Sequence, residues 1–126
     1  MATQQLARQG DPAVDSDPEQ LSGASIFTIL WEAVADVLGT ATTAALFRRA
    51  LKRAMPLHPE LGQLVIVREN LRFWYEVAPS WQERHVLAPP ALRELVAQLR
   101  PMLVEMTGQV VVQQVLQMPA LKGRGF

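Results

Sequence analysis

The sequence predicts an α+β fold, and two patterns carry that prediction. Apolar residues recur with a helical period before residue 56 and after residue 90, whereas residues 63–78 alternate with a period of two. A chain of 126 residues, of which 49% are hydrophobic and 19% charged, is long enough for one core and too short for two. We therefore expect one compact domain in which helices cover a small, mostly antiparallel sheet.

The two ends of the chain differ in composition from the middle. Residues 1–16 contain acidic and small polar residues with few large apolar ones, so we expect a flexible acidic N-terminal tail. Residues 17–118 carry the periodic patterns and form the predicted domain. Pro119 and the glycines that follow it mark residues 119–126 as a short basic C-terminal tail.

Two amphipathic segments predict an antiparallel helical hairpin. The first helix begins at Asp17, Ser22 or Ser25, which are all residues that can cap a helix. Gly39 suits the position just after a helix, so we expect a very short connection to the second helix. The second helix covers roughly residues 41–55 and ends at the prolines that follow, because proline lacks the amide donor.

The second helix separates its charges from its apolar residues. Four basic side chains fall on one helical face within two turns: Arg48, Arg49, Lys52 and Arg53. Such a basic stripe binds phosphates, an acidic protein or the acidic tail of the same chain, or it is simply solvated. The formal net charge of zero and the lack of a recognition motif argue against nucleic acid as its partner.

Residues 63–78 predict a β-hairpin that turns at Glu69-Asn70. A two-residue turn there places two sets of side chains on opposite faces. The first face carries Leu64, Ile66, Leu71, Phe73, Tyr75 and Val77, and the second carries Val65, Val67, Arg72, Trp74 and Glu76. In this register Val65 lies beside Trp74 across the strands. A three-residue loop with Asn70 in a left-handed conformation is the alternative.

A third helical stripe runs from Leu92 to Met106. Pro101 lies inside it and removes one intrahelical hydrogen bond, so we expect a kink in this third helix or its division in two. Residues 109–118 are rich in valine and match the period of a helix as well as that of a strand. The β-propensity of valine leads us to predict a third strand there.

The sequence holds no motif for catalysis, metal binding or a cofactor. Because the chain has no cysteine, thiol nucleophiles, disulfides and thiolate metal sites are excluded. His58 and His85 lie in separate predicted loops, so we expect no metal site from them. Met55, Met102 and Met106 fall on apolar stripes, where methionine fills gaps in a core. We therefore expect no enzyme, no catalytic residues and no cofactor.

The sequence also bears on location. No apolar run approaches the roughly 20 residues needed to cross a bilayer, and the first residues lack the pattern of a secretory signal. We expect a soluble, cytoplasmic protein without a membrane span.

Two surfaces remain as candidates for an interaction. The first joins Trp74, Val65 and Val67 on the second hairpin face with the nearby Trp81, since tryptophan is enriched where binding energy concentrates. The second is the basic stripe. We expect a non-catalytic, adaptor-type interaction or regulatory module that acts as a homodimer and binds an unidentified protein, for which an acidic one is suited. The alternative is a small-molecule-binding sensor domain with an apolar pocket between the sheet and the third helix.

Overall fold

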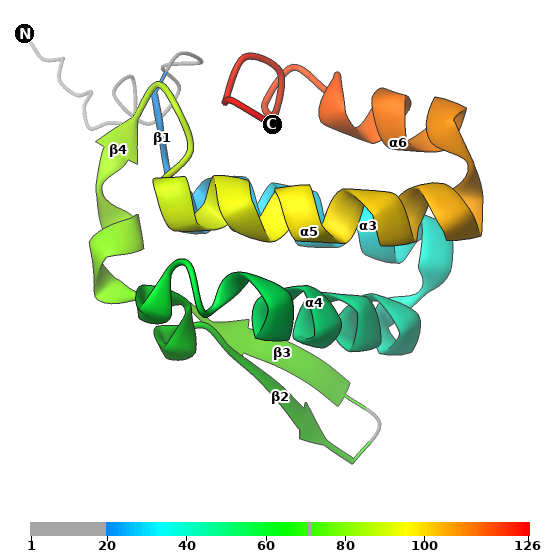
Figure 1. The fold of residues 1–126 in the computed structure, drawn as a ribbon, viewed down its shortest axis with the longest axis horizontal. Coiled ribbons are helices and arrows are strands. Elements are labelled where there is room, and N and C mark those ends of the chain that lie inside the picture. Colours follow the sequence, from blue (N-terminus) through cyan, green and yellow to red (C-terminus); the bar gives the residue numbers. More distant parts are fainter. Residues whose placement is uncertain (1–19, 71) are drawn as a thin grey trace, which may run out of the picture.

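A computed structural model describes residues 20–70 and 72–126 and confirms the α+β class. Four α-helices make up most of this part of the chain, and a two-stranded antiparallel hairpin lies beside them (Figure 1). The helices are α3 (Gly23–Leu38), α4 (Thr40–Ala54), α5 (Pro90–Thr107) and α6 (Gln109–Leu116), and the hairpin strands are β2 (Val65–Glu69) and β3 (Arg72–Glu76). A second, very short strand pair joins β1 (Leu21–Ser22) to β4 (Arg84–His85). Two 3-10 turns complete the order, Pro59–Gln63 and Pro79–Gln82.

The predicted helical hairpin is formed by α3 and α4. Of the three predicted starting points, the structure selects Ser22, whose Oγ accepts a hydrogen bond from the backbone N–H of Ser25 at 3.0 Å. Gly39 ends α3 with φ +83° and also precedes the first residue of α4, so one residue connects the two helices. A positive φ of this kind is open to glycine without steric cost.

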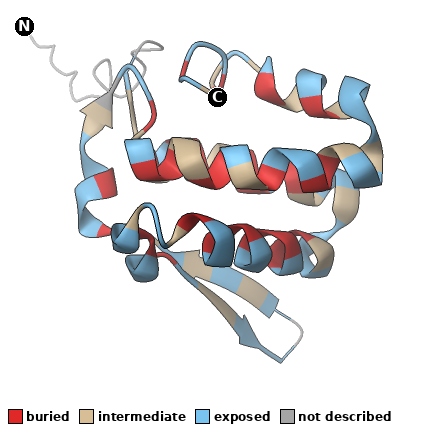
Figure 2. Cartoon of the chain, viewed as in Figure 1, coloured by how far each residue is buried: buried red, intermediate tan, exposed pale blue. Residues whose placement is uncertain are grey.

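The helices and the β2–β3 hairpin share one core. In Figure 1 α4 lies between the hairpin and α5, and α6 lies on the far side of α5. The buried residues gather on the faces that the helices turn toward one another (Figure 2). An aromatic cluster fastens the hairpin to the helices: the ring of Phe27 lies 5.4 Å from that of Phe47 and 4.7 Å from that of Tyr75.

The turn between β2 and β3 begins one residue later than predicted, and this changes which residues pair across the two strands. Glu69 pairs with Arg72, and Asn70 has φ +59°, so the turn begins at Asn70 and the left-handed conformation considered for that residue is present. Trp74 consequently lies opposite Val67 and not opposite Val65, as the sequence predicted. The partners move by two positions, which leaves every described residue on its predicted face.

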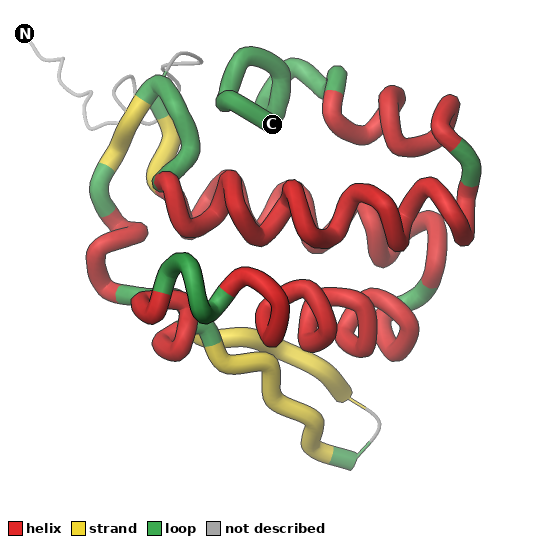
Figure 3. The backbone as a smooth tube through the Cα atoms, viewed as in Figure 1, coloured by secondary structure: helices red, strands yellow, loops and turns green. Residues whose placement is uncertain are grey.

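One prediction about the C-terminal half is wrong, and another is reduced to one of its two alternatives. Residues 109–118 form no strand: α6 occupies Gln109–Leu116, and its buried residues Val112 and Leu116 are four apart, as on one face of a helix. Of the two outcomes expected at Pro101, a kink or a division, the division does not occur: α5 continues past this exposed residue as one helix to Thr107 (Figure 3).

The C-terminal segment packs on the domain. Leu121 and Arg124 are only 1% and 3% exposed, and the Arg124 guanidinium donates hydrogen bonds to the carbonyls of Val86 at 2.8 Å and Ala120 at 3.0 Å. The packed domain therefore extends beyond the predicted boundary at residue 118. The predicted N-terminal tail, residues 1–16, lies outside the residues that the structure describes.

Candidate interaction surfaces

The hairpin rests on α3 through its first face. The Tyr75 hydroxyl donates a hydrogen bond to Thr28 Oγ1 at 2.7 Å, and the rings of Phe27 and Trp31 pack against the Tyr75 ring. Burial raises the pKa of the Tyr75 phenol above its ordinary value, the hydrogen bond with Thr28 acts in the opposite direction, and the charge of Glu32 raises it further. The first hairpin face therefore packs against the core.

The second hairpin face is open. Trp74 is 37% exposed and Val65 45% exposed, and Val67 lies half-buried directly across from Trp74. The charged residues Arg72 and Glu76 flank this apolar group on the same face and are exposed. We call Val65, Val67 and Trp74 the open hairpin face.

Trp81 does not join this surface. It is 2% exposed, and its ring centroid lies 6.1 Å from that of Phe27, so it is a core residue and not the predicted interaction residue. The turn Pro79–Gln82 directs the side chain inward, next to Gly23 at the start of α3. The position of Trp81 close to Trp74 in the sequence did not indicate that its side chain is buried.

The basic stripe is placed as the sequence predicted. Arg48, Arg49, Lys52 and Arg53 are all exposed on the outer face of α4. Arg48 reaches the hairpin, where its Nη2 donates to the carbonyl oxygen of Ile66 at 3.2 Å. Within residues 20–70 and 72–126 none of the four forms an ion pair, since the pair found there joins His58 to Glu60 at 3.7 Å.

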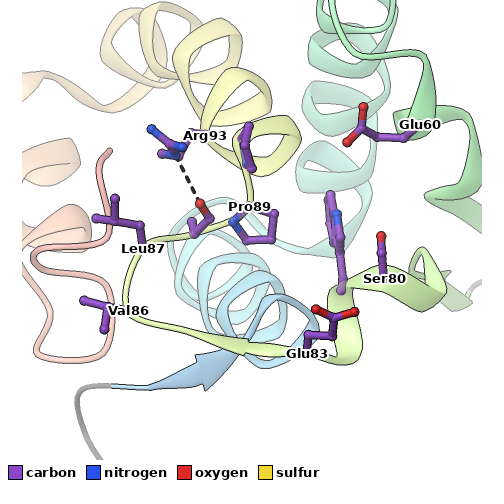
Figure 4. A pocket seen from close by; sticks show the side chains of 10 residues that line it. Glu60, Ser80, Glu83, Val86, Leu87, Pro89 and Arg93 are labelled. Atoms are coloured by element: carbon purple, nitrogen blue, oxygen red, sulfur yellow. Dashed lines mark hydrogen bonds between the residues drawn. The ribbon is translucent and has the colours of Figure 1, made fainter.

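A hollow of about 510 Å³ opens beside Trp81 (Figure 4). Glu60 lines it from the turn Pro59–Gln63, and Ser80 and Glu83 line it from the turn Pro79–Gln82 and the residue after it. The two carboxylates do not point toward one another in Figure 4. Arg93 also lines it, but its Nε donates to the Ala88 carbonyl at 3.1 Å.

The pocket of the sensor-domain alternative is not formed where the sequence placed it. It was expected between the sheet and the third helix, but α4 separates the β2–β3 hairpin from α5 (Figure 1). A small apolar crevice lies elsewhere, between α3 and α6, and has room for about 10 Å³. A space of that size holds about one water molecule and would not hold an organic ligand.

Two further observations concern the described part of the chain. No group of three or more metal-ligating side chains comes together in it, and none of its helices is long and apolar enough to cross a membrane. Comparison of the chain with protein-family models, with curated proteins and with solved structures finds no significant match.

Proposed function

We propose that this domain is a non-catalytic interaction module of the adaptor type that acts as a homodimer, with the open hairpin face at its self-association surface. One observation carries the proposal. Val65, Val67 and Trp74 form an apolar group on a sheet face that no described element covers. An antiparallel sheet meets water with polar residues, whereas an apolar cluster of this kind normally lies under another element.

A second copy of the chain is a suitable cover. Two-fold pairing brings the apolar patches of both subunits together, so each patch shields part of the other from water. Tryptophan is among the residues that contribute most to binding when they lie at the centre of an interface. Trp74 lies at the centre of the open hairpin face, with Val67 across from it and charged residues on either side.

The basic stripe supplies a separate surface for another partner. Its exposed cations lie on α4 and have no carboxylate partner among the described residues, which suits an acidic protein surface. The proposed module would thus join copies of itself through the hairpin and bind an acidic partner through α4. The proposal includes a cytoplasmic location. Disulfides stabilise many proteins of oxidising compartments, and this chain has no cysteine with which to form one.

The substitution Trp74→Arg tests the proposed dimer. It removes an aromatic anchor and places a charge in the patch, so we expect light scattering to show a shift from dimer toward monomer with little change in thermal stability. Val110→Arg is the matched control, because Val110 is 68% exposed on α6, away from the hairpin, and its substitution should leave the dimer intact. A monomeric wild type, or a dimer that Val110→Arg dissociates and Trp74→Arg does not, would contradict the proposal.

A further inference from the structure

The outer edge of β3 carries backbone groups without a partner in the described residues. In an antiparallel pair, opposite residues alternate between those that bond to each other and those whose backbone groups point away from the partner strand. The Ile66 carbonyl accepts from Arg48 and so points away from β3, which assigns Ile66 and its opposite residue Tyr75 to the second kind. Phe73 shares this orientation, two residues before Tyr75. Both residues therefore direct an N–H and a C=O to the outer edge of β3, where β3 has no further strand neighbour.

The residues of β3 have an order that complements itself. The strand reads Arg72, Phe73, Trp74, Tyr75, Glu76, with a cation at one end, an anion at the other and aromatic residues between them. If the strand is laid antiparallel beside its own copy with Trp74 at the centre, Arg72 lies opposite Glu76 of the second copy, and Phe73 lies opposite Tyr75. Opposite charges placed across from each other stabilise paired strands, and like charges destabilise them.

We propose that two copies join edge to edge through β3, around a two-fold axis that passes beside Trp74, and so build one four-stranded sheet. The outward groups of Phe73 and Tyr75 then meet those of Tyr75 and Phe73 of the second copy, and the edge of β3 that lacks a strand neighbour in each chain gains one. On the open face the two Trp74 side chains lie side by side, and Val67 of each chain extends the row. This inference rests on the proposed homodimer and specifies how its two subunits meet.

Charge favours edge pairing over stacking one hairpin face on another. Glu69, Arg72 and Glu76 lie on the same face as Trp74, so stacking would take them out of water. Burial of charged groups is costly unless each is paired. Edge pairing keeps them at the surface and orders them across the sheet as Glu69, Arg72 and then Glu76 of the second copy. The alternation of charge therefore continues from one subunit into the next.

Charge reversal tests this register. Arg72→Glu places two carboxylates opposite each other at both ends of the joined strands, and Glu76→Arg places two guanidinium groups there. Each variant alone should have a dimer dissociation constant raised about tenfold or more, because two attractive pairs become repulsive. Mixed together, the two variants should form a heterodimer of nearly wild-type affinity, since every charge then faces its opposite. Sedimentation of the full-length chains measures all of these species.

The outcomes of the mixing experiment separate the two proposals. If the wild type is monomeric, both the homodimer and the edge pairing are wrong. If the wild type is dimeric and Trp74→Arg dissociates it, but the mixed variants do not recover affinity, the homodimer stands and the β3 register is wrong. Recovery of affinity in the mixture supports both the homodimer and the β3 register. If the substitutions acted only by destabilising the fold of each chain, mixing two destabilised chains would not restore the dimer.

A disulfide measures the same geometry independently, because the chain has no cysteine of its own. At the two-fold axis the Cα atoms of position 74 would be about 4.5 Å apart, within the range that a disulfide spans. We expect Trp74→Cys to yield a covalent dimer on mild oxidation, which also traps a weakened dimer. Val65→Cys is the control: in the four-stranded sheet its two copies lie three strand spacings apart across the sheet and four residues apart along it, roughly 20 Å in all, and should not cross-link. Cross-linking through Val65→Cys in place of Trp74→Cys would overturn edge pairing.

Discussion

Gly23, the first residue of α3, is the point where two distant segments approach the helix. A Cβ atom added there would lie 2.8 Å from Cγ of Pro89 and 3.1 Å from Cβ of Trp81. Neither atom is the free end of a flexible side chain, so neither can move aside cheaply. The glycine therefore allows Trp81 and Pro89 to close over the start of α3.

We expect Gly23→Ala to destabilise the domain by about 1–3 kcal/mol, the usual cost of overpacking. This is the opposite of what helix propensity alone predicts, since alanine is favoured over glycine by about 1 kcal/mol inside a helix. Urea unfolding of the full chain measures the difference. Gly62→Ala is the control, because a Cβ at Gly62 meets no atom within 4 Å. A stabilised Gly23→Ala variant would show that this contact is loose.

Tyr75 makes stability depend on alkaline pH. Because burial raises the pKa of its phenol in the folded state, the folded protein holds this proton more tightly than the unfolded chain does. The resulting stability is fully present below the ordinary pKa of about 10 and is lost as pH rises through the higher folded value. Tyr75→Phe removes this dependence, so the free-energy advantage of the wild type over the variant should shrink as pH rises above about 10. An advantage that stays constant over this range would contradict the assignment.

At the scale of single elements, the basic stripe of α4 is expected to serve binding and not folding. Arg49 and Arg53 are exposed and have no ion-pair partner within the described residues. Exposed charges of this kind usually contribute less than about 1 kcal/mol each. The double substitution Arg49→Glu with Arg53→Glu should therefore shift the melting temperature by only a few degrees in a calorimetric scan. A drop much larger than that would mean that the two side chains are paired.

The sequence predicted the helices whose stripes are clean and failed where the period was ambiguous. In α4 the buried residues Phe47, Ala50 and Ala54 recur at helical spacing opposite the basic stripe, so one pattern alone predicts the helix. In α6 the valines matched two periods, and valine prefers strands only where a sheet offers neighbours to pack against. Here Val112 packs in the helical core instead, and no adjacent strand is present for it in the described residues.

The candidate site was predictable to the extent that it depends on alternation. The placement of Val65, Val67 and Trp74 on one face required only a period of two, and a turn error that moved the partners by two positions did not change it. The turn begins at Asn70 and not at Glu69, because asparagine tolerates the positive φ that this position requires. The burial of Trp81 depends on Gly23, nearly sixty residues away in the chain, and no local pattern carries such a contact.

At the scale of the whole molecule, segments far apart in the sequence close one core. The backbone N–H of Ala88 donates to the carbonyl of Arg124 at 3.0 Å, and the guanidinium of Arg124 donates to the carbonyl of Val86 at 2.8 Å. Leu21 pairs across to β4, and partly buried Phe126 packs against the core at the other end of the chain. Residues 20–126 therefore contribute to one packed unit, with core residues from Leu21 to Phe126.

Removal of residues 1–16 should leave this unit intact. Every described residue of the core lies at Leu21 or later, and the composition of the first 16 residues offers little apolar surface to bury against it. We expect the shortened chain to unfold in one cooperative transition, with a midpoint in urea close to that of the full chain. Circular dichroism and tryptophan fluorescence should give coincident curves, as a two-state domain requires.

Deletion of residues 122–126 is the contrasting control, because it removes buried Arg124 and its bond to Val86 and should lower the midpoint clearly. If the N-terminal deletion abolished the cooperative transition and the C-terminal deletion did not, the core would have to include the acidic segment, and the domain boundary predicted from composition would be wrong.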